Sequence, residues 1–162
     1  MDDPAQLLDL DSKGRTMNQL DIGPIRPPNP SMMERLNRFL VAEVAAVAAY
    51  RLVLVRYPIE AGTLIIPGLH IHEQIMESVA EWIENLGGSE AAIGDGSSAF
   101  SGLEQLPSDK AGFVLAITLM RAGERRHAQD AGKDLHLLDE YTRTFVVHHV
   151  APELARCLHA LG

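Results

Sequence analysis

The chain has 162 residues, of which 46% are hydrophobic and 22% charged, and its formal net charge is −8. This length suffices for one domain whose core needs neither disulfides nor structural zinc. The negative charge argues against a nucleic-acid binder, which needs a basic face, and favours metal ions as partners. With Cys157 as its one cysteine, the chain has neither an intramolecular disulfide nor a cysteine-rich zinc or iron–sulfur site.

The beginning of the chain predicts an extension rather than a targeting signal. Met1-Asp2-Asp3 lacks the basic start and apolar run of a secretory signal, and no apolar stretch is long enough to cross a membrane. We therefore expect a cytoplasmic protein without membrane contact. Pro27, Pro28 and Pro30 are incompatible with a helix interior. Residues 1–30 are accordingly predicted to form an extended or disordered arm, and residues 31–162 a helical bundle.

Helical periodicity predicts the elements of this bundle. The first helix spans residues 31–56, with Ser31 as its N-cap and Glu34 completing a capping box. The second is clearest over residues 69–86, before Gly87-Gly88, and Pro67 leaves its beginning open.

A Gly- and Ser-rich loop follows over residues 89–107, and Ser108 or Asp109 caps a third helix. This helix breaks near residues 129–132 or continues to about residue 139, and a divided fourth helical segment completes the chain. Because no segment shows strand alternation, the sequence predicts an all-α bundle.

Glu43 is a carboxylate in the middle of the apolar stripe of the first helix. The stripe contains Leu36, Leu40, Val47 and Tyr50 at helical spacing. Burying a bare carboxylate costs several kcal/mol, so a residue in this position is usually protonated, paired or bound to a metal.

Glu124 and His127 repeat this anomaly on the third helix. They stand three residues apart on the stripe of Ile117 and Met120, so both side chains point the same way. Carboxylate-bridged di-iron and di-manganese centres use a Glu-x-x-His pair on a bundle-facing stripe. The structural alternative is that Glu124 pairs with a cation such as Arg121 and His127 lies on the helix surface.

Two further segments offer ligands. On the second helix His72 faces inward by period and Glu73 lies one step round, so one of the two is a candidate ligand. Near the end of the chain His148 or His149 could complete a site.

The first helix resembles that of bacterioferritins and related ferritin-like proteins. In that family the glutamate is a di-iron ligand, and the tyrosine seven residues later supports the site from the neighbouring helix. The resemblance rests on Leu36-Asn37, Leu40, Glu43, Ala46 and Tyr50.

Two other segments extend the resemblance over roughly residues 31–150. Residues 69–88 are similar to the second helix of bacterioferritins and of the mini-ferritins that protect DNA in starved cells. Glu124-Arg125-Arg126-His127 matches the Glu-x-x-His of a later helix. The family's second helix normally carries its own Glu-x-x-His, and here Met76 stands at the histidine place while His72 is the substitute. The resemblance implies an antiparallel ferritin-like four-helix bundle.

Two functions follow as hypotheses. The first is a metal-binding protein that oxidises or stores iron as a ferroxidase, with one or two iron ions and Tyr50 as a hydrogen-bond donor beside them. Manganese and zinc remain open. The second is a metal-free dimeric bundle with a structural, interaction or stress-related role, whose polar core fixes helix register. Under either hypothesis we expect a homo-oligomer, a dimer or larger. The candidate ligands are Glu43, His72, Glu73, Glu124, His127 and His148.

Overall fold

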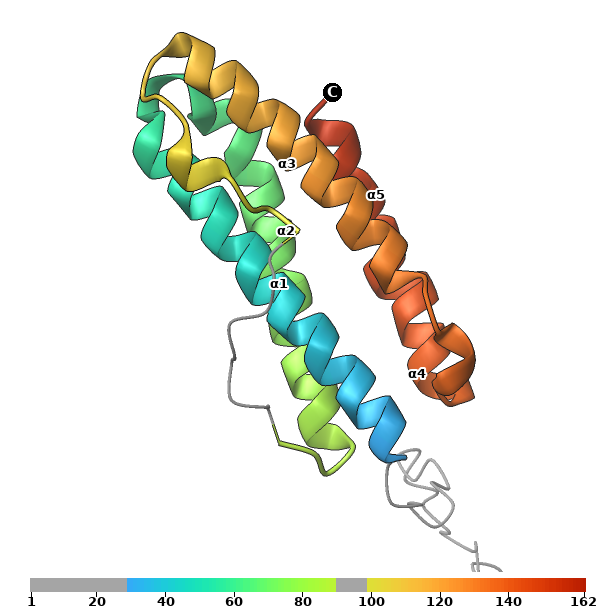
Figure 1. Ribbon diagram of the computed structural model, residues 1–162. Helices are drawn as coiled ribbons and strands as arrows, with labels where there is room; N and C mark the ends of the chain where they lie inside the picture. The colour runs from blue at the N-terminus through green and yellow to red at the C-terminus, as the bar shows by residue number, and fades with distance from the viewer. Residues whose placement is uncertain (1–28, 90–98) are drawn as a thin grey trace, which may run out of the picture.

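The computed structural model describes residues 29–89 and 99–162, and within these ranges the chain is helical and contains no strand (Figure 1). This confirms the all-α prediction. Of the arm predicted over residues 1–30, residues 1–28 lie outside the described residues, as does most of the Gly- and Ser-rich loop, and Pro30 already belongs to the first helix. The helices are α1 (Pro30–Arg56), α2 (Pro58–Asn85), α3 (Lys110–Ala131), α4 (Glu140–Phe145) and α5 (Ala151–Ala160).

The predicted N-cap of α1 was wrong by two residues. Asn29 is the cap, and its side chain accepts a hydrogen bond from the Ser31 backbone N–H at 3.0 Å. Pro30 follows it in the first turn, where proline's missing N–H has no helical acceptor to lose. The helix therefore begins at the Asn29–Pro30 pair and not at the capping box of Ser31.

α2 is longer than its clearest sequence pattern. It begins at Pro58, one residue after Tyr57 ends α1, and it continues through Pro67 to Asn85. α1 and α2 consequently lie side by side along most of their lengths (Figure 1). Asp109 caps α3 by accepting from the Gly112 N–H at 2.8 Å.

The segment predicted as a divided fourth helix is a continuous helix with one irregular stretch. α4 continues through a π-helical stretch (Val146–Val150) into α5. Trp82 of α2 anchors the start of this path, because its indole N–H donates to Thr142 Oγ1 at 3.1 Å and its ring stacks on Phe145.

The helices enclose a common interior. α1 contacts α2 and α3, and α5 contacts the same two helices from the other side, so the order around the bundle is α1, α2, α5, α3 (Figure 1). Two apolar clusters fill this interior. One surrounds Tyr50, Ile65 and Met120, and the other surrounds Leu36, Ile75 and Leu154. Along each of α1 and α3 the glutamate on the inner stripe lies between residues of the two clusters.

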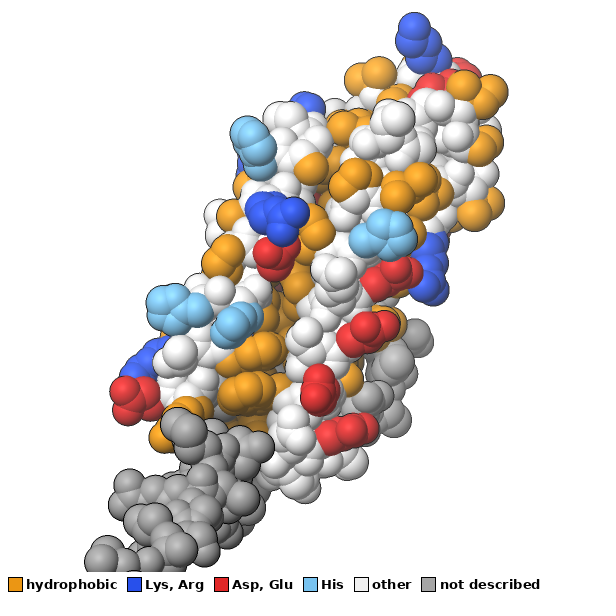
Figure 2. All heavy atoms as spheres, turned by 180° about the vertical axis from the view of Figure 1, so that it is seen from behind, with side chains coloured by type: hydrophobic (Ala, Val, Ile, Leu, Met, Phe, Trp, Pro, Cys, Tyr) orange, Lys and Arg blue, Asp and Glu red, His pale blue; other side chains and the backbone are white. Residues whose placement is uncertain are grey.

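The outer surface is mixed in character. Seen from behind, hydrophobic side chains form a band that charged and histidine side chains flank (Figure 2). Over the described residues, no helix combines the length and apolarity that crossing a membrane requires.

Candidate metal centre

Four buried polar side chains meet between the two apolar clusters. Glu43 comes from α1, His72 from α2, and Glu124 and His127 from α3, and none is more than 2% exposed. Glu124 and His127 share a face because they are three residues apart in a helix. These four residues therefore face inward in the folded chain, as their places on the apolar stripes predict.

His72 lies between the two carboxylates. Its Nδ1 is 2.8 Å from Glu43 Oε2, and its Nε2 is 2.9 Å from Glu124 Oε1. Both ring nitrogens thus lie within hydrogen-bond distance of a carboxylate oxygen, and an imidazolium, which donates from each nitrogen, satisfies both contacts. Burial lowers the pKa of His72, but hydrogen bonds with Cys157 and the two carboxylates outweigh burial and raise it to about 12.

Glu43 is also held by His127, whose Nε2 donates to Glu43 Oε1 at 2.7 Å. The His127 ring stacks on Phe39, with centroids 5.5 Å apart, which fixes its orientation. Burial raises the pKa of Glu43, but the hydrogen bonds from His127 and His72 outweigh burial and leave this pKa below its ordinary value. Glu43 is therefore an ionised carboxylate in the core.

Tyr50 donates its hydroxyl hydrogen to Glu124 Oε1 at 2.9 Å. Burial and the charge of Glu124 raise the pKa of Tyr50 well above its ordinary value, so the hydroxyl stays a donor. The ring fits against α2 because residue 68 is glycine. A Cβ at Gly68 would lie 2.4 Å from Tyr50 Cε1.

The other oxygen of Glu124 is the exception in this network. Among the described residues, Glu124 Oε2 is the one buried side-chain nitrogen or oxygen atom without a hydrogen-bond partner. Leaving a buried carboxylate oxygen unsatisfied costs free energy, so such an atom calls for an explanation. A cation bound to this oxygen is an explanation that suits the charge of a carboxylate.

The donor set fits a divalent transition metal. One ligand atom each from Glu43, His72 and His127 lie within 4.8 Å of one another. Two imidazoles and a carboxylate suit iron, manganese or zinc. A divalent ion would also compensate the buried negative charge of Glu43 once His72 gave up its extra proton.

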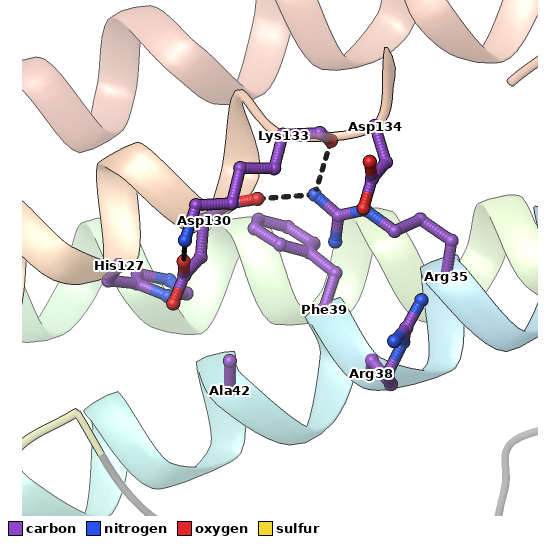
Figure 3. A pocket seen from close by; sticks show the side chains of 8 residues that line it. All are labelled: Arg35, Arg38, Phe39, Ala42, His127, Asp130, Lys133 and Asp134. Atoms are coloured by element: carbon purple, nitrogen blue, oxygen red, sulfur yellow. Dashed lines mark hydrogen bonds and ion pairs between the residues drawn. The ribbon is translucent and has the colours of Figure 1, made fainter. Parts of the chain in front are cut away.

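A surface pocket of about 250 Å³ reaches this cluster from the side (Figure 3). His127 and Phe39 form part of its wall, while Arg35 crosses its other end and donates to the Lys133 carbonyl at 3.0 Å. The pocket therefore connects solvent to a candidate ligand. Its lining consists of Arg35, Arg38, Phe39, Ala42, His127, Asp130, Lys133 and Asp134.

Two predicted ligands lie elsewhere. Glu73 is at the surface of α2, where it pairs with Arg51 at 2.7 Å, because the inward orientation of His72 turns the next residue about 100° away. Of the two alternatives on α2, the structure thus brings only His72 to the cluster. His148 is exposed, since Val146 and Val150 occupy the inward positions of its segment.

The sequence interpretation missed Cys157 as a member of this group. Its side chain is fully buried, and His72, Glu124 and Cys157 each offer one ligand atom within 4.8 Å of the others. The available signal was spacing: Cys157 stands three residues after Leu154 and four before Leu161, both buried on the same helical face.

Comparisons of the chain with protein-family models, with curated proteins and with solved structures gave no match. The class of the protein is therefore defined by its own fold and site. Its described residues form an all-helical bundle with a buried cluster of glutamate and histidine side chains.

Proposed function

We propose that this protein is a ferritin-like, antiparallel helical bundle that binds a divalent transition metal ion through Glu43, His72 and His127, with iron as the preferred ion. The observation that carries the proposal is convergence. Three helices each direct a nitrogen or oxygen donor to one buried point, with mutual distances within 4.8 Å.

Each residue has a role under this proposal. Glu43 supplies a carboxylate that is already ionised, and His127 supplies an imidazole oriented by Phe39. His72 supplies the second imidazole after releasing a proton to solvent. Tyr50 is a positioning residue, since its hydroxyl fixes Glu124 Oε1 and leaves Oε2 free to turn toward a cation. A bound transition metal supplies Lewis acidity and, for iron, one-electron redox chemistry.

The proposed activity is the oxidation or storage of iron, with Fe²⁺ as substrate and O₂ or peroxide as oxidant. The pocket beside His127 offers a route for the ion, and its wall contains both acidic and basic side chains. The net charge of −8 also favours the approach of cations.

Oxidation is tested by adding Fe²⁺ in air to metal-stripped protein and following the absorbance of ferric products. Wild type should oxidise Fe²⁺ faster than a Glu43→Ala Glu124→Ala variant. Glu73→Ala is the matched control, because it removes a surface glutamate from the same bundle. Equal rates for wild type and the double variant would refute a ferroxidase role for this cluster.

A second candidate function has its own observation. Both oxygens of Glu43 and both ring nitrogens of His72 already have hydrogen-bond partners without an ion. This near-complete network supports a metal-free bundle whose polar core fixes helix register. Elemental analysis of protein purified without added metal or chelator separates the candidates, because the metal-free function requires that iron, manganese and zinc all be absent.

We also propose a homo-oligomer. Large hydrophobic side chains are exposed around the junction of α1 and α2, among them Val55 (81%) and Ile59 (91%), and such side chains are frequent at subunit interfaces. Size-exclusion chromatography with light scattering tests this, and an entirely monomeric protein would refute it.

A further inference from the structure

We propose a second metal position in the bundle, formed by His72, Glu124 and Cys157, which takes a borderline divalent ion such as Zn²⁺ or Co²⁺. It deepens the proposed function, because it shares His72 with the first position. The first position offers nitrogen and oxygen donors, whereas the second adds sulfur.

The geometry of the three side chains carries the inference. Their ligand atoms lie within 4.8 Å of one another, and all three residues are fully buried. They come from three different helices, α2, α3 and α5, so packing of the whole bundle holds them together. Cys157 thus places α5 in the site, the one long helix that contributes nothing to the first position.

A second observation is independent of the cysteine. Glu124 Oε2 is fully buried and lacks a hydrogen-bond partner anywhere in the described part of the chain, while Oε1 accepts from both Tyr50 and His72. The carboxylate therefore has one oxygen held in place and one available for a cation. The Cys157 thiol lies 3.8 Å from the Gly68 carbonyl and also contacts His72, the residue with which it would share the ion.

The His72 ring divides the two positions. Nδ1 faces Glu43 at 2.8 Å and Nε2 faces Glu124 at 2.9 Å. A neutral imidazole has a single lone pair, so the ring serves an ion on one side at a time. Binding at the second position therefore leaves the proton on Nδ1, where Glu43 accepts it.

Ligand chemistry sets the metal preference. On binding, the thiol loses its proton to solvent and Sγ coordinates the ion as a thiolate. Thiolate and carboxylate together neutralise a divalent charge, and three protein ligands leave a fourth tetrahedral position open. Thiolate favours Zn²⁺ and Co²⁺ over hard ions such as Mg²⁺ or Mn²⁺.

Cobalt titration gives a direct test, because Cys157 is the only cysteine in the chain. Co²⁺ is added anaerobically to metal-stripped full-length protein while the near-ultraviolet thiolate-to-cobalt charge-transfer band is recorded. Wild type should develop this band in proportion to bound Co²⁺, and equimolar Zn²⁺ should abolish it. Cys157→Ser should lose the band entirely while keeping the helical circular dichroism of wild type.

Two variants separate this proposal from the first metal position. His127→Ala removes a ligand of the first position only, so it should keep the band. Glu124→Gln should weaken it strongly. If wild type binds Co²⁺ without developing the band, and His127→Ala no longer binds Co²⁺, this inference is overturned and the first position stands. Absence of Co²⁺ binding in wild type would overturn both. Should Cys157→Ser fail to fold, Cys157→Ala gives the same readout.

Discussion

His127 and Glu43 are 84 residues apart in the chain, yet their side chains meet at 2.7 Å in the interior of the bundle. α1 and α3 would each be an ordinary amphipathic helix if leucine replaced the polar residues on the inner stripe. The contact joins α1 to α3 through a charged group that is fully buried. Removing one partner of such a pair destabilises the folded protein, so the residues of the cluster depend on one another.

The ligand role of His127 predicts metal-dependent stability. Binding to the folded state alone stabilises a protein by about 2.7 kcal/mol when the free ligand is 100 times its dissociation constant. Urea unfolding of wild type should show this gain with Fe²⁺ under anaerobic conditions, and His127→Ala should not. His148→Ala, an exposed histidine, is the control and should gain as wild type does. An equal gain in His127→Ala would remove His127 from the ligand set.

Tyr50→Phe tests the positioning role of the hydroxyl. The variant loses the hydrogen bond to Glu124 but keeps the ring, so we expect the affinity for Co²⁺ at the His72, Glu124 and Cys157 position to fall by about 10–100-fold, the usual effect of an outer-sphere partner. Equilibrium dialysis measures the affinity. Tyr141→Phe alters a tyrosine that is 82% exposed and should bind as wild type. Unchanged affinity in Tyr50→Phe would show that Glu124 needs no such support.

Gly68→Ala tests the close approach of α2 to Tyr50. The new Cβ would meet Tyr50 Cε1 at 2.4 Å, so the ring must move. We expect a loss of about 1–3 kcal/mol in the free energy of unfolding, together with weaker metal binding. Gly62→Ala is the matched control within the same helix, because the new Cβ would meet nothing within 4 Å apart from its chain neighbours and the backbone of its own helix. That variant should be neutral or gain up to about 1 kcal/mol. A Gly68→Ala protein as stable as the control would contradict the packing.

The pH dependence of the metal-free protein follows from two residues. The pKa of Glu43 is lowered from 4.5, so its contribution to stability is present above pH 4.5 and lost as pH falls further. The pKa of His72 is raised from 6.5 to about 12, so its contribution is complete below pH 6.5 and declines as pH rises above it. Stability measured by urea unfolding with chelator should therefore be greatest between about pH 4.5 and 6.5.

A control variant isolates the alkaline side of this profile. His72→Gln removes the titrating ring and should flatten the decline above pH 6.5, whereas His148→Gln should leave the profile unchanged. A wild-type stability that stays constant above pH 6.5 would mean that His72 is neutral in the folded protein.

Much of the fold was predictable because its signals are local. Apolar periodicity and the Gly87-Gly88 stop gave α1 and the end of α2 to within a residue or two. The N-cap was missed because Asn29-Pro30 and Ser31 with Glu34 are competing local signals. The sequence left the beginning of α2 open because it contains Pro67, which the bundle tolerates inside a helix.

The buried polar cluster was predictable where a polar residue interrupts an apolar stripe. Glu43, Glu124 and His127 were found in this way, and the inward period of His72 distinguished it from Glu73. Cys157 was missed because cysteine is itself apolar enough to continue a stripe, so it raised no anomaly. The pairing of particular atoms, such as Nδ1 with Glu43 and Nε2 with Glu124, depends on how three helices pack and has no local signal.

The most direct test of the metal-centre proposal compares two glutamates by metal content. Metal-stripped wild type, Glu43→Gln and Glu73→Gln are dialysed anaerobically against equal Fe²⁺, and bound iron is measured by elemental analysis. Both substitutions remove one charge, but only Glu43 belongs to the buried cluster. Wild type and Glu73→Gln should hold stoichiometric iron, and folded Glu43→Gln should hold little or none. Equal iron in the two variants, or none in wild type, would contradict the proposed metal centre.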